Sequence, residues 1–210
     1  MTTTPNATAN TSRRLGRPSQ AEIAARKANL LRVAASQFVR FGYRSTTMAQ
    51  IAAAADLTKQ TLYSWHGDKA ALFLACLTHG AARFPLLHIE TSQDVETSLR
   101  NYVVALIREL TSEYVLDFAL LMLREGHEFS ELSAAVDRSS KQFIEEPLAR
   151  FFRFHGLESE DADEKATLFI ALALAPLHNR LLIGRPIPGA RKIKKHAATV
   201  VKIFLHGCDI

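Results

Sequence analysis

Cysteine is scarce in this chain, and long hydrophobic runs are absent. Cys76 and Cys208 are the only cysteines among 210 residues, which excludes a disulfide framework and a four-thiolate metal site. The longest nearly uninterrupted apolar run, residues 168–177, is far shorter than the roughly 18 residues of a membrane span. Residues 1–12 lack the apolar stretch of a secretory signal. We therefore expect a cytoplasmic protein with no membrane partner.

Signatures of catalysis and cofactor binding are also missing. The sequence has no glycine-rich phosphate loop, no nucleophile elbow and no His-Glu-x-x-His motif. None of the eight histidines shares a helical face with a second donor at the spacing of metal ligands. We expect no metal site, no cofactor and no enzymatic activity.

Helix formers are what the sequence has in abundance. Alanine and leucine are frequent, and neither strict alternation of β-branched residues nor an Asn-Gly or Asp-Gly hairpin signal occurs. Hydrophobic residues make up 48% of the chain and charged residues 22%, a balance that supports a packed core. We expect an all-α fold of about nine helices.

Positive charge is concentrated at the front of the chain. Residues 1–69 contain 10 lysines and arginines against 3 acidic residues, whereas residues 70–210 contain 16 against 18. A basic front end on a slightly acidic body is typical of a polyanion-binding module joined to a part with another task.

Capping signals divide this basic part into three helices, expected over about residues 20–41, 48–55 and 59–66. Ser19–Glu22 and Thr47–Gln50 match the capping box, and Gly42 is suited to end the first helix. Two short helices joined by a tight turn behind a longer one predict a helix-turn-helix unit. A three-helix bundle without a partner is the alternative, but the motif coincides with the basic charge.

Residues 24–73 also follow the pattern of a known DNA-binding domain. The matching residues are Leu30, Leu31, Ala34, Ala35, Phe38, Phe41, Gly42, Tyr43, Thr46, Thr47, Met48, Ile51, Ala52, Ala54, Ala55, Leu57, Lys59, Thr61, Leu62, Tyr63, Asp68, Lys69, Leu72 and Phe73. In this pattern the chain resembles the TetR/AcrR family of transcriptional regulators. Ala55 stands where the family usually has glycine, Thr58 where serine is common and His66 where phenylalanine is common.

The third helix is expected to enter the DNA major groove. Lys59 in its first turn can donate to a guanine or a phosphate, and Gln60 can pair with adenine, although both also suit a solvated surface. The resemblance implies phosphate contacts for Tyr63 and Lys69. The full set of expected DNA contacts is Thr47, Thr58, Lys59, Gln60, Thr61, Tyr63 and Lys69, with Arg13, Arg14 and Arg17 of a flexible arm that can enter the minor groove.

We divide the chain into a basic arm (1–18), a helix-turn-helix domain (19–68) and a larger helical domain (69–210). The larger domain is expected to contain a helix from Lys69 towards Pro85 and five more over about 93–110, 112–126, 130–154, 160–183 and 190–206. Pro147 and Pro176 are expected to kink the two helices that contain them.

The resemblance implies that the larger domain binds a small-molecule inducer and forms a homodimer through its last two helices. The candidate pocket residues are Phe118, Leu121, Met122, Phe143 and Phe151, for each of which ordinary core is the alternative. The candidate interface residues are Leu172, Ala173, Leu177, Val201 and Phe204. The helix over 160–183 is apolar all round and must be buried, either partly against a second subunit or as the central helix of a monomer.

The leading hypothesis is a dimeric repressor that a small hydrophobic ligand releases from a double-stranded DNA operator. An activator, or a regulator of the same family without a ligand, is the first alternative. An all-helical enzyme with an accessory DNA-binding module is the alternative from another class.

Overall fold

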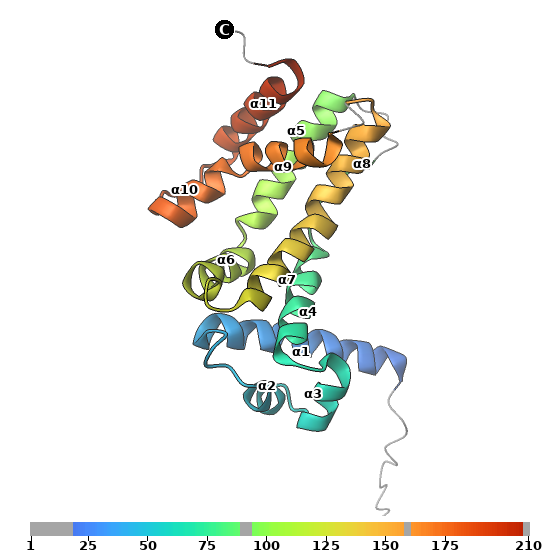
Figure 1. The fold of residues 1–210 in the computed structure, drawn as a ribbon, viewed down its shortest axis with the longest axis vertical. Coiled ribbons are helices and arrows are strands. Elements are labelled where there is room, and N and C mark those ends of the chain that lie inside the picture. The colour runs from blue at the N-terminus through green and yellow to red at the C-terminus, as the bar shows by residue number, and fades with distance from the viewer. Residues whose placement is uncertain (1–18, 89–93, 158–160, 208–210) are drawn as a thin grey trace, which may run out of the picture.

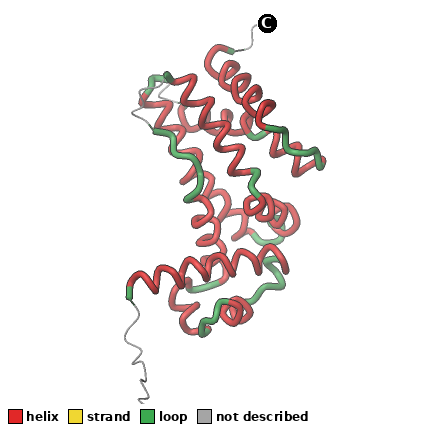
Figure 2. The backbone as a smooth tube through the Cα atoms, turned by 180° about the vertical axis from the view of Figure 1, so that it is seen from behind, coloured by secondary structure: helices red, strands yellow, loops and turns green. Residues whose placement is uncertain are grey.

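The computed structural model describes residues 19–88, 94–157 and 161–207, and this part of the chain is all helical, without strands (Figure 2). Arg13, Arg14 and Arg17 of the expected arm lie outside the described residues.

The helices form an N-terminal unit and a larger body, with a connecting helix between them (Figure 1). The unit consists of α1 (Gln20–Phe41), α2 (Met48–Ala54) and α3 (Lys59–His66). The connecting helix is α4 (Lys69–Ala81). The body consists of α5 (Val95–Leu110), α6 (Glu113–Glu125), α7 (Ser130–Ser140), the π-helical segment η1 (Lys141–Glu145), α8 (Glu146–Phe154), α9 (Ala162–Ala173), α10 (Ala175–Ile183) and α11 (Ala190–His206). α11 lies at the end of the molecule opposite to α2 and α3 (Figure 1).

The first two helices begin at the capping boxes that the sequence predicts. The Ser19 N–H donates to the Glu22 carboxylate at 2.7 Å, and the Glu22 N–H donates to the Ser19 hydroxyl at 3.2 Å. Thr47 and Gln50 form the same reciprocal pair at the start of α2. Gly42 ends α1 with a φ of 85°, a conformation that glycine adopts without strain. The expected bounds of the first and third helices are confirmed, and the second helix ends at Ala54, one residue before the expected end.

The kink expected at Pro176 occurs, whereas the helix that contains Pro147 is interrupted by a π-helical segment. The residues expected as one helix over 130–154 form α7, η1 and α8 in succession, and Pro147 follows the π-helical segment. The residues expected as one helix over 160–183 are broken at Leu174, two residues before Pro176, with a bend of 56° between α9 and α10. Proline lacks the N–H of a helical hydrogen bond and its ring crowds the preceding turn, so the helix must deform there. With each interrupted helix counted once, the described residues form the nine expected helices.

No single helix among the described residues is long and apolar enough to cross a membrane. The bent pair of α9 and α10 meets the length and composition only when both helices are taken together.

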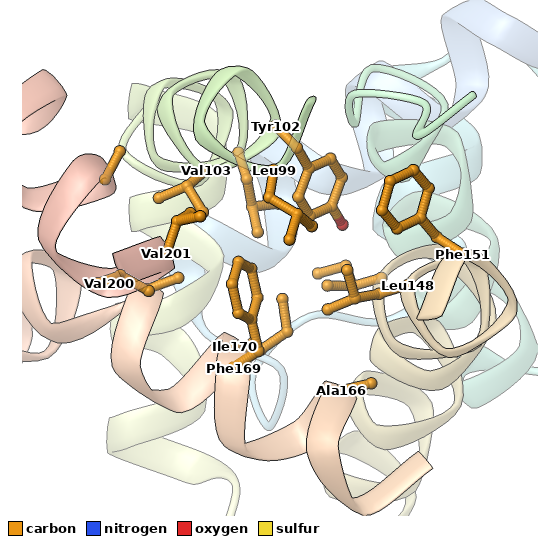
Figure 3. Packing of buried hydrophobic residues seen from close by; sticks show 14 of the residues in the cluster. Leu99, Tyr102, Val103, Leu148, Phe151, Ala166, Phe169, Ile170, Val200 and Val201 are labelled. Atoms are coloured by element: carbon orange, nitrogen blue, oxygen red, sulfur yellow. The ribbon is translucent and has the colours of Figure 1, made fainter. Parts of the chain in front are cut away.

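The body has a hydrophobic core of its own. α5, α8, α9 and α11 direct their apolar side chains towards one another, with Tyr102, Phe151 and Phe169 among the largest (Figure 3). Val200 and Val201 close this core from the α11 side (Figure 3).

A second core joins the N-terminal unit to the body, and we call it the junction core. Its members come from α1 to α4, from the loop between α1 and α2, and from α6 and α7. They are Leu30, Ala34, Ala35, Phe38, Tyr43, Met48, Ile51, Ala52, Ala55, Leu62, Leu72, Phe73, Cys76, Phe118, Leu121, Leu132 and Ala135. The N-terminal unit is therefore packed into the body and not merely tethered to it.

Aromatic rings run through the centre of the junction core. The Phe73 ring on α4 lies 5.4 Å from Phe38, 5.5 Å from Tyr43 and 5.5 Å from Phe118, measured between ring centroids. Phe118 in turn lies 5.1 Å from Tyr114. Such distances are typical of favourable aromatic pairs, so one side chain of α4 contacts both parts of the molecule.

We predict that Phe73→Ala lowers the free energy of unfolding by about 3–5 kcal/mol, because it leaves a cavity at a fully buried position. Urea unfolding followed by circular dichroism measures the change. Phe41→Ala is the matched control, since Phe41 is 50% exposed, and it should cost far less. Equal effects of the two substitutions would contradict the role of Phe73.

Candidate nucleic-acid interface and adjoining cavity

α3 presents its first turn to solvent and is anchored by its inner face. Lys59, Gln60 and Tyr63 are exposed, and neither Lys59 nor Gln60 has a hydrogen-bond partner within the described part of the chain. Leu62 is fully buried in the junction core. A recognition helix needs this arrangement, because its first turn must reach base edges while its body stays fixed.

The turn between α2 and α3 accommodates alanine at position 55. Ala55 has φ −95° and ψ 4°, which need no glycine. The positive φ of this turn, 53°, belongs to Asp56, a residue type that tolerates it comparatively well. The Leu57 N–H donates to the carbonyl of Ala52 at 2.9 Å. The departure from the family pattern at Ala55 therefore leaves the turn intact.

The expected threonines lie at the starts of α2 and α3, where Thr47 and Thr58 act as caps and Thr61 belongs to the first turn of α3. The Thr58 hydroxyl accepts the Thr61 N–H at 3.1 Å and lies 2.8 Å from the Thr61 hydroxyl. The Thr47 hydroxyl accepts the Gln50 N–H at 3.2 Å. Thr47 and Thr58 are exposed and Thr61 is half-buried, so these bonds fix where the helices begin at the protein surface.

Lys69 is held within the protein. Its ammonium group donates to the carbonyl oxygens of Tyr43 at 2.8 Å and Thr46 at 3.2 Å, and it lies 4.2 Å from the centroid of the Tyr43 ring. Burial lowers its pKa. An ammonium group has three donors, so these two bonds leave one for the phosphate contact that the sequence predicts. Lys69 therefore connects α4 to the loop between α1 and α2.

Carboxylates at the end of α6 and the start of α7 hold the same loop from the other side. Glu125 accepts the Arg44 N–H at 2.8 Å, and Glu128 forms an ion pair with the Arg44 guanidinium. The Tyr43 hydroxyl donates to Glu131 at 3.4 Å, and burial, followed by the charge of Glu131, raises the pKa of Tyr43. These pairs have no local sequence signal, because their partners are more than 80 residues apart.

His66 replaces the phenylalanine common in the family. Its Nε2 atom is buried and has no hydrogen-bond partner among the described residues. Burial lowers the pKa of His66, and the charge of Lys27 lowers it further, so the ring is neutral at pH 7. A neutral imidazole can take the packing role of an aromatic ring, which leaves the position beneath α3 filled.

A cavity of about 380 Å³ lies on the far side of the junction core, between α4, α6, α7, η1 and the break of α9 and α10. Tyr114, Phe118 and Met122 of α6 line it, opposite Gly80 and Ala81 of α4. The Phe118 ring therefore lines the cavity on one side and belongs to the junction core on the other.

The structure separates the five residues expected in the pocket. Phe118 and Met122 line the cavity, whereas Leu121 points into the junction core, Phe151 lies in the core of the body and Phe143 lines a separate surface hollow. The apolar character of these residues could not show which neighbours each side chain meets. The small and polar lining residues, such as Gly80 and Ser139, have no local sequence signal and were not predicted.

Most of the residues expected at a dimer interface fill the core of their own subunit. Ala173, Leu177 and Val201 are buried within the described chain, and the Phe204 ring stacks on Phe152 at 4.9 Å. Only Leu172 is exposed, at 42%. This corrects the expectation for Ala173, Leu177 and Val201, because α5 and α8 of the same chain cover one side of the apolar helices, whereas Phe204 is only half-buried.

The other side of these helices remains uncovered. Leu168 and Leu172 of α9 and Leu182 and Ile183 of α10 are all exposed. The exposed residues of α11 are mostly basic, among them Lys192 and Lys195, with Ile203 as an exposed apolar residue.

Neither metal ligands nor a reactive thiol are found in the described residues. No group of three or more histidine, cysteine, aspartate or glutamate side chains is placed to hold an ion in that part of the chain. Cys76 is fully buried, and burial raises the pKa of its thiol to about 12. The neutral form is therefore dominant, which disfavours the redox chemistry of this residue.

Two family models match the chain. The model described as bacterial regulatory proteins, tetR family, matches residues 30–76, and the model of the AefR-like transcriptional repressor C-terminal domain matches residues 97–207. No curated protein is similar enough in sequence to count as a relative.

Solved structures share the fold. The flavonoid-responsive regulator FrrA is 22% identical with a TM-score of 0.72, covering 88% of this chain and 97% of that one. A TetR transcriptional regulator from Agrobacterium tumefaciens is 24% identical with a TM-score of 0.67, covering 85% and 92%. The fatty acid degradation regulator FadR from Bacillus halodurans is 16% identical with a TM-score of 0.64, covering 86% and 98%.

The matched ranges contain the helix-turn-helix unit at one end and most of the helical body at the other. The chain therefore belongs to the TetR family of bacterial regulatory proteins and is a DNA-binding transcriptional regulator.

Proposed function

We propose that this regulator is a dimeric repressor that leaves its operator when a small hydrophobic ligand enters the cavity. The observation that carries the proposal is the shared wall at Phe118, which belongs both to the cavity and to the core that holds the DNA-binding unit. Two regulators of the same fold are named for flavonoid response and fatty acid degradation, which supports a small organic molecule as the signal. A regulator of a bacterial operator acts in the cytoplasm, where we place this chain.

The DNA contacts would centre on the first turn of α3. Lys59 and Gln60 are exposed there and have no hydrogen bond within the described residues. The Lys59 ammonium group can therefore donate to base edges, and the Gln60 amide can both donate and accept. The exposed hydroxyl of Tyr63, the capping residues Thr47 and Thr58, the neighbouring Thr61 and the third donor of Lys69 would contact phosphates. The arm residues Arg13, Arg14 and Arg17 would add minor-groove contacts.

The ligand can release DNA only if it binds the released conformation better than the DNA-bound one. α4 connects the two sites physically, because Ala81 near its end lines the cavity and Lys69 at its start holds the loop before α2. A shift of α4 by a ligand would move α3 with it. A typical coupling of about 1–3 kcal/mol would reduce operator affinity roughly 5- to 150-fold.

The homodimer would form through the exposed apolar face of α9 and α10. Leu168, Leu172, Leu182 and Ile183 supply this face. The lysine-rich start of α11 is better suited to solvent than to a buried contact with an identical copy, because like charges repel, and Ile203 is the exposed large apolar residue of this helix. We therefore assign the main contact to α9 and α10, in place of the buried residues first expected.

We predict that Lys59→Ala weakens operator binding. Loss of a phosphate contact would weaken binding to all sequences alike and reduce the salt slope of the association constant by about 1. Loss of a guanine contact would instead relax the preference at one base pair by roughly 1–3 kcal/mol. Fluorescence anisotropy over a range of salt concentrations distinguishes the two.

Lys192→Ala is the control for this experiment, because it removes the same charge from the exposed face of α11 at the opposite end of the molecule. It should leave operator affinity nearly unchanged. Tyr63→Phe removes one exposed hydroxyl and should weaken binding without loss of stability. Unchanged affinity for both Lys59→Ala and Tyr63→Phe would remove these residues from the interface.

We predict that Leu172→Arg weakens dimerisation by roughly tenfold or more, because it places a charge against an apolar contact. Sedimentation equilibrium at micromolar concentration measures the association. Leu86→Arg, at a 79% exposed position after α4, is the matched control and should leave the dimer intact. A wild-type protein that is monomeric under these conditions would contradict the proposed dimer.

A further inference from the structure

The cavity contains no charged side chain. Its lining, as far as the structure describes it, includes no aspartate, glutamate, lysine or arginine, and its one ionisable imidazole, His127, is exposed to solvent. A charged group inside would lose its hydration without gaining a counter-charge, which is strongly unfavourable.

Two of the polar groups in the lining already have partners. The Tyr114 hydroxyl donates to the carbonyl of Cys76 at 3.0 Å, and the Ser140 hydroxyl donates to the Glu145 carboxylate at 2.8 Å. These bonds leave the two hydroxyl groups less available to a ligand.

Ser139 is different. It is 92% buried, it lines the cavity, and its hydroxyl has no hydrogen bond to any other described residue. It lies next to the end of α7, just before the π-helical segment, where Ser140 and Ile144 also line the cavity. A serine hydroxyl in a cavity wall that has no partner in the described chain can donate a hydrogen bond to a polar atom of a ligand or accept one from it.

Most of the remaining wall is aliphatic, because nine of its lining side chains are leucine, isoleucine or valine. Phe84, Tyr114 and Phe118 contribute rings. Gly80 lies against Tyr114 so closely that a Cβ atom there would come within 2.6 Å of the Tyr114 ring. The absence of a side chain at Gly80 thus allows this ring to take its place in the wall, and flat apolar ligands stack well on such rings.

We propose that the cavity takes an uncharged, largely apolar molecule with one buried polar group, and that the Ser139 hydroxyl hydrogen-bonds to that group. This inference rests on the proposed function, since it assigns the chemical class of the ligand and one residue that selects it. Carboxylates, phosphate esters and amines are excluded as ligands of the buried part of the cavity.

Three probes of similar shape test the class: biphenyl, para-phenylphenol and para-phenylbenzoate. They differ in having no polar group, an uncharged hydroxyl or a negative charge. Isothermal titration calorimetry of the full chain at neutral pH should give binding of the two uncharged compounds, with para-phenylphenol the tighter. Binding of para-phenylbenzoate as tightly as para-phenylphenol, or no binding of either uncharged compound, would overturn the proposal.

Two substitutions test the residue. Ser139→Ala should weaken para-phenylphenol about three- to tenfold, as expected for one lost hydrogen bond, and should leave biphenyl binding unchanged. Ser130→Ala, at an exposed position of the same helix, is the control and should change neither affinity. Equal effects of Ser139→Ala on both compounds would contradict a hydrogen bond from Ser139.

Ala119→Leu shows whether the probes occupy this cavity, because Ala119 lines it and the larger side chain fills part of it. Both uncharged compounds should bind this variant more weakly, and unchanged affinities would place them elsewhere and overturn the proposal.

Operator binding measured in the same mixtures separates the two claims. Ser139-dependent binding of para-phenylphenol without any change in operator affinity would contradict the ligand-released repressor and support the inference. Operator release by para-phenylbenzoate alone would support the repressor and overturn the inference.

Discussion

The rest of the structure depends on the packing of Phe73 between the two parts of the molecule. From α4, this ring contacts Phe38 and Tyr43 of the N-terminal unit and Phe118 of the body. The bonds from Lys69 to two loop carbonyls and from Arg44 to Glu125 fix the polar edge of the same contact. The DNA-binding unit therefore has a set orientation on the body, which a flexible linker would not provide.

The same packing places the cavity next to the DNA-binding unit. Phe118 and Tyr114 are in contact with each other and line the cavity. A molecule in the cavity therefore touches Phe118, which packs directly against Phe73 of α4. Close-packed interiors respond to a new occupant by discrete rearrangement because they have little free space. A ligand that fits the cavity only after such a rearrangement would favour the conformation that releases DNA.

Local chemistry was sufficient to predict the helices and the recognition unit. Ser19, Thr47 and Thr58 mark helix starts, and Pro147 and Pro176 mark the two interruptions, because each effect acts within one turn of helix. The resemblance over residues 24–73 identified the family.

The neighbours of an apolar residue could not be predicted in this way. Phe118 and Leu121 are one helical turn apart on α6, yet only Phe118 lines the cavity. Val201 and Ala173 looked equally suited to a second subunit or to their own core, and the packing of α5 and α8 decides the question. The carbonyl partners of Lys69 are 26 and 23 residues away, and only the folded chain brings them together.

The central claim is that the body of the protein fixes the position of α3 and hence the spacing of the DNA sites that a dimer can read. Selection of binding sequences from a random duplex pool by the purified full chain tests it most directly. The account predicts enrichment of two inverted half-sites at one fixed separation, with centres about 34–36 Å apart or a multiple of that distance. Enrichment of single half-sites, or of half-sites at many separations, would contradict it.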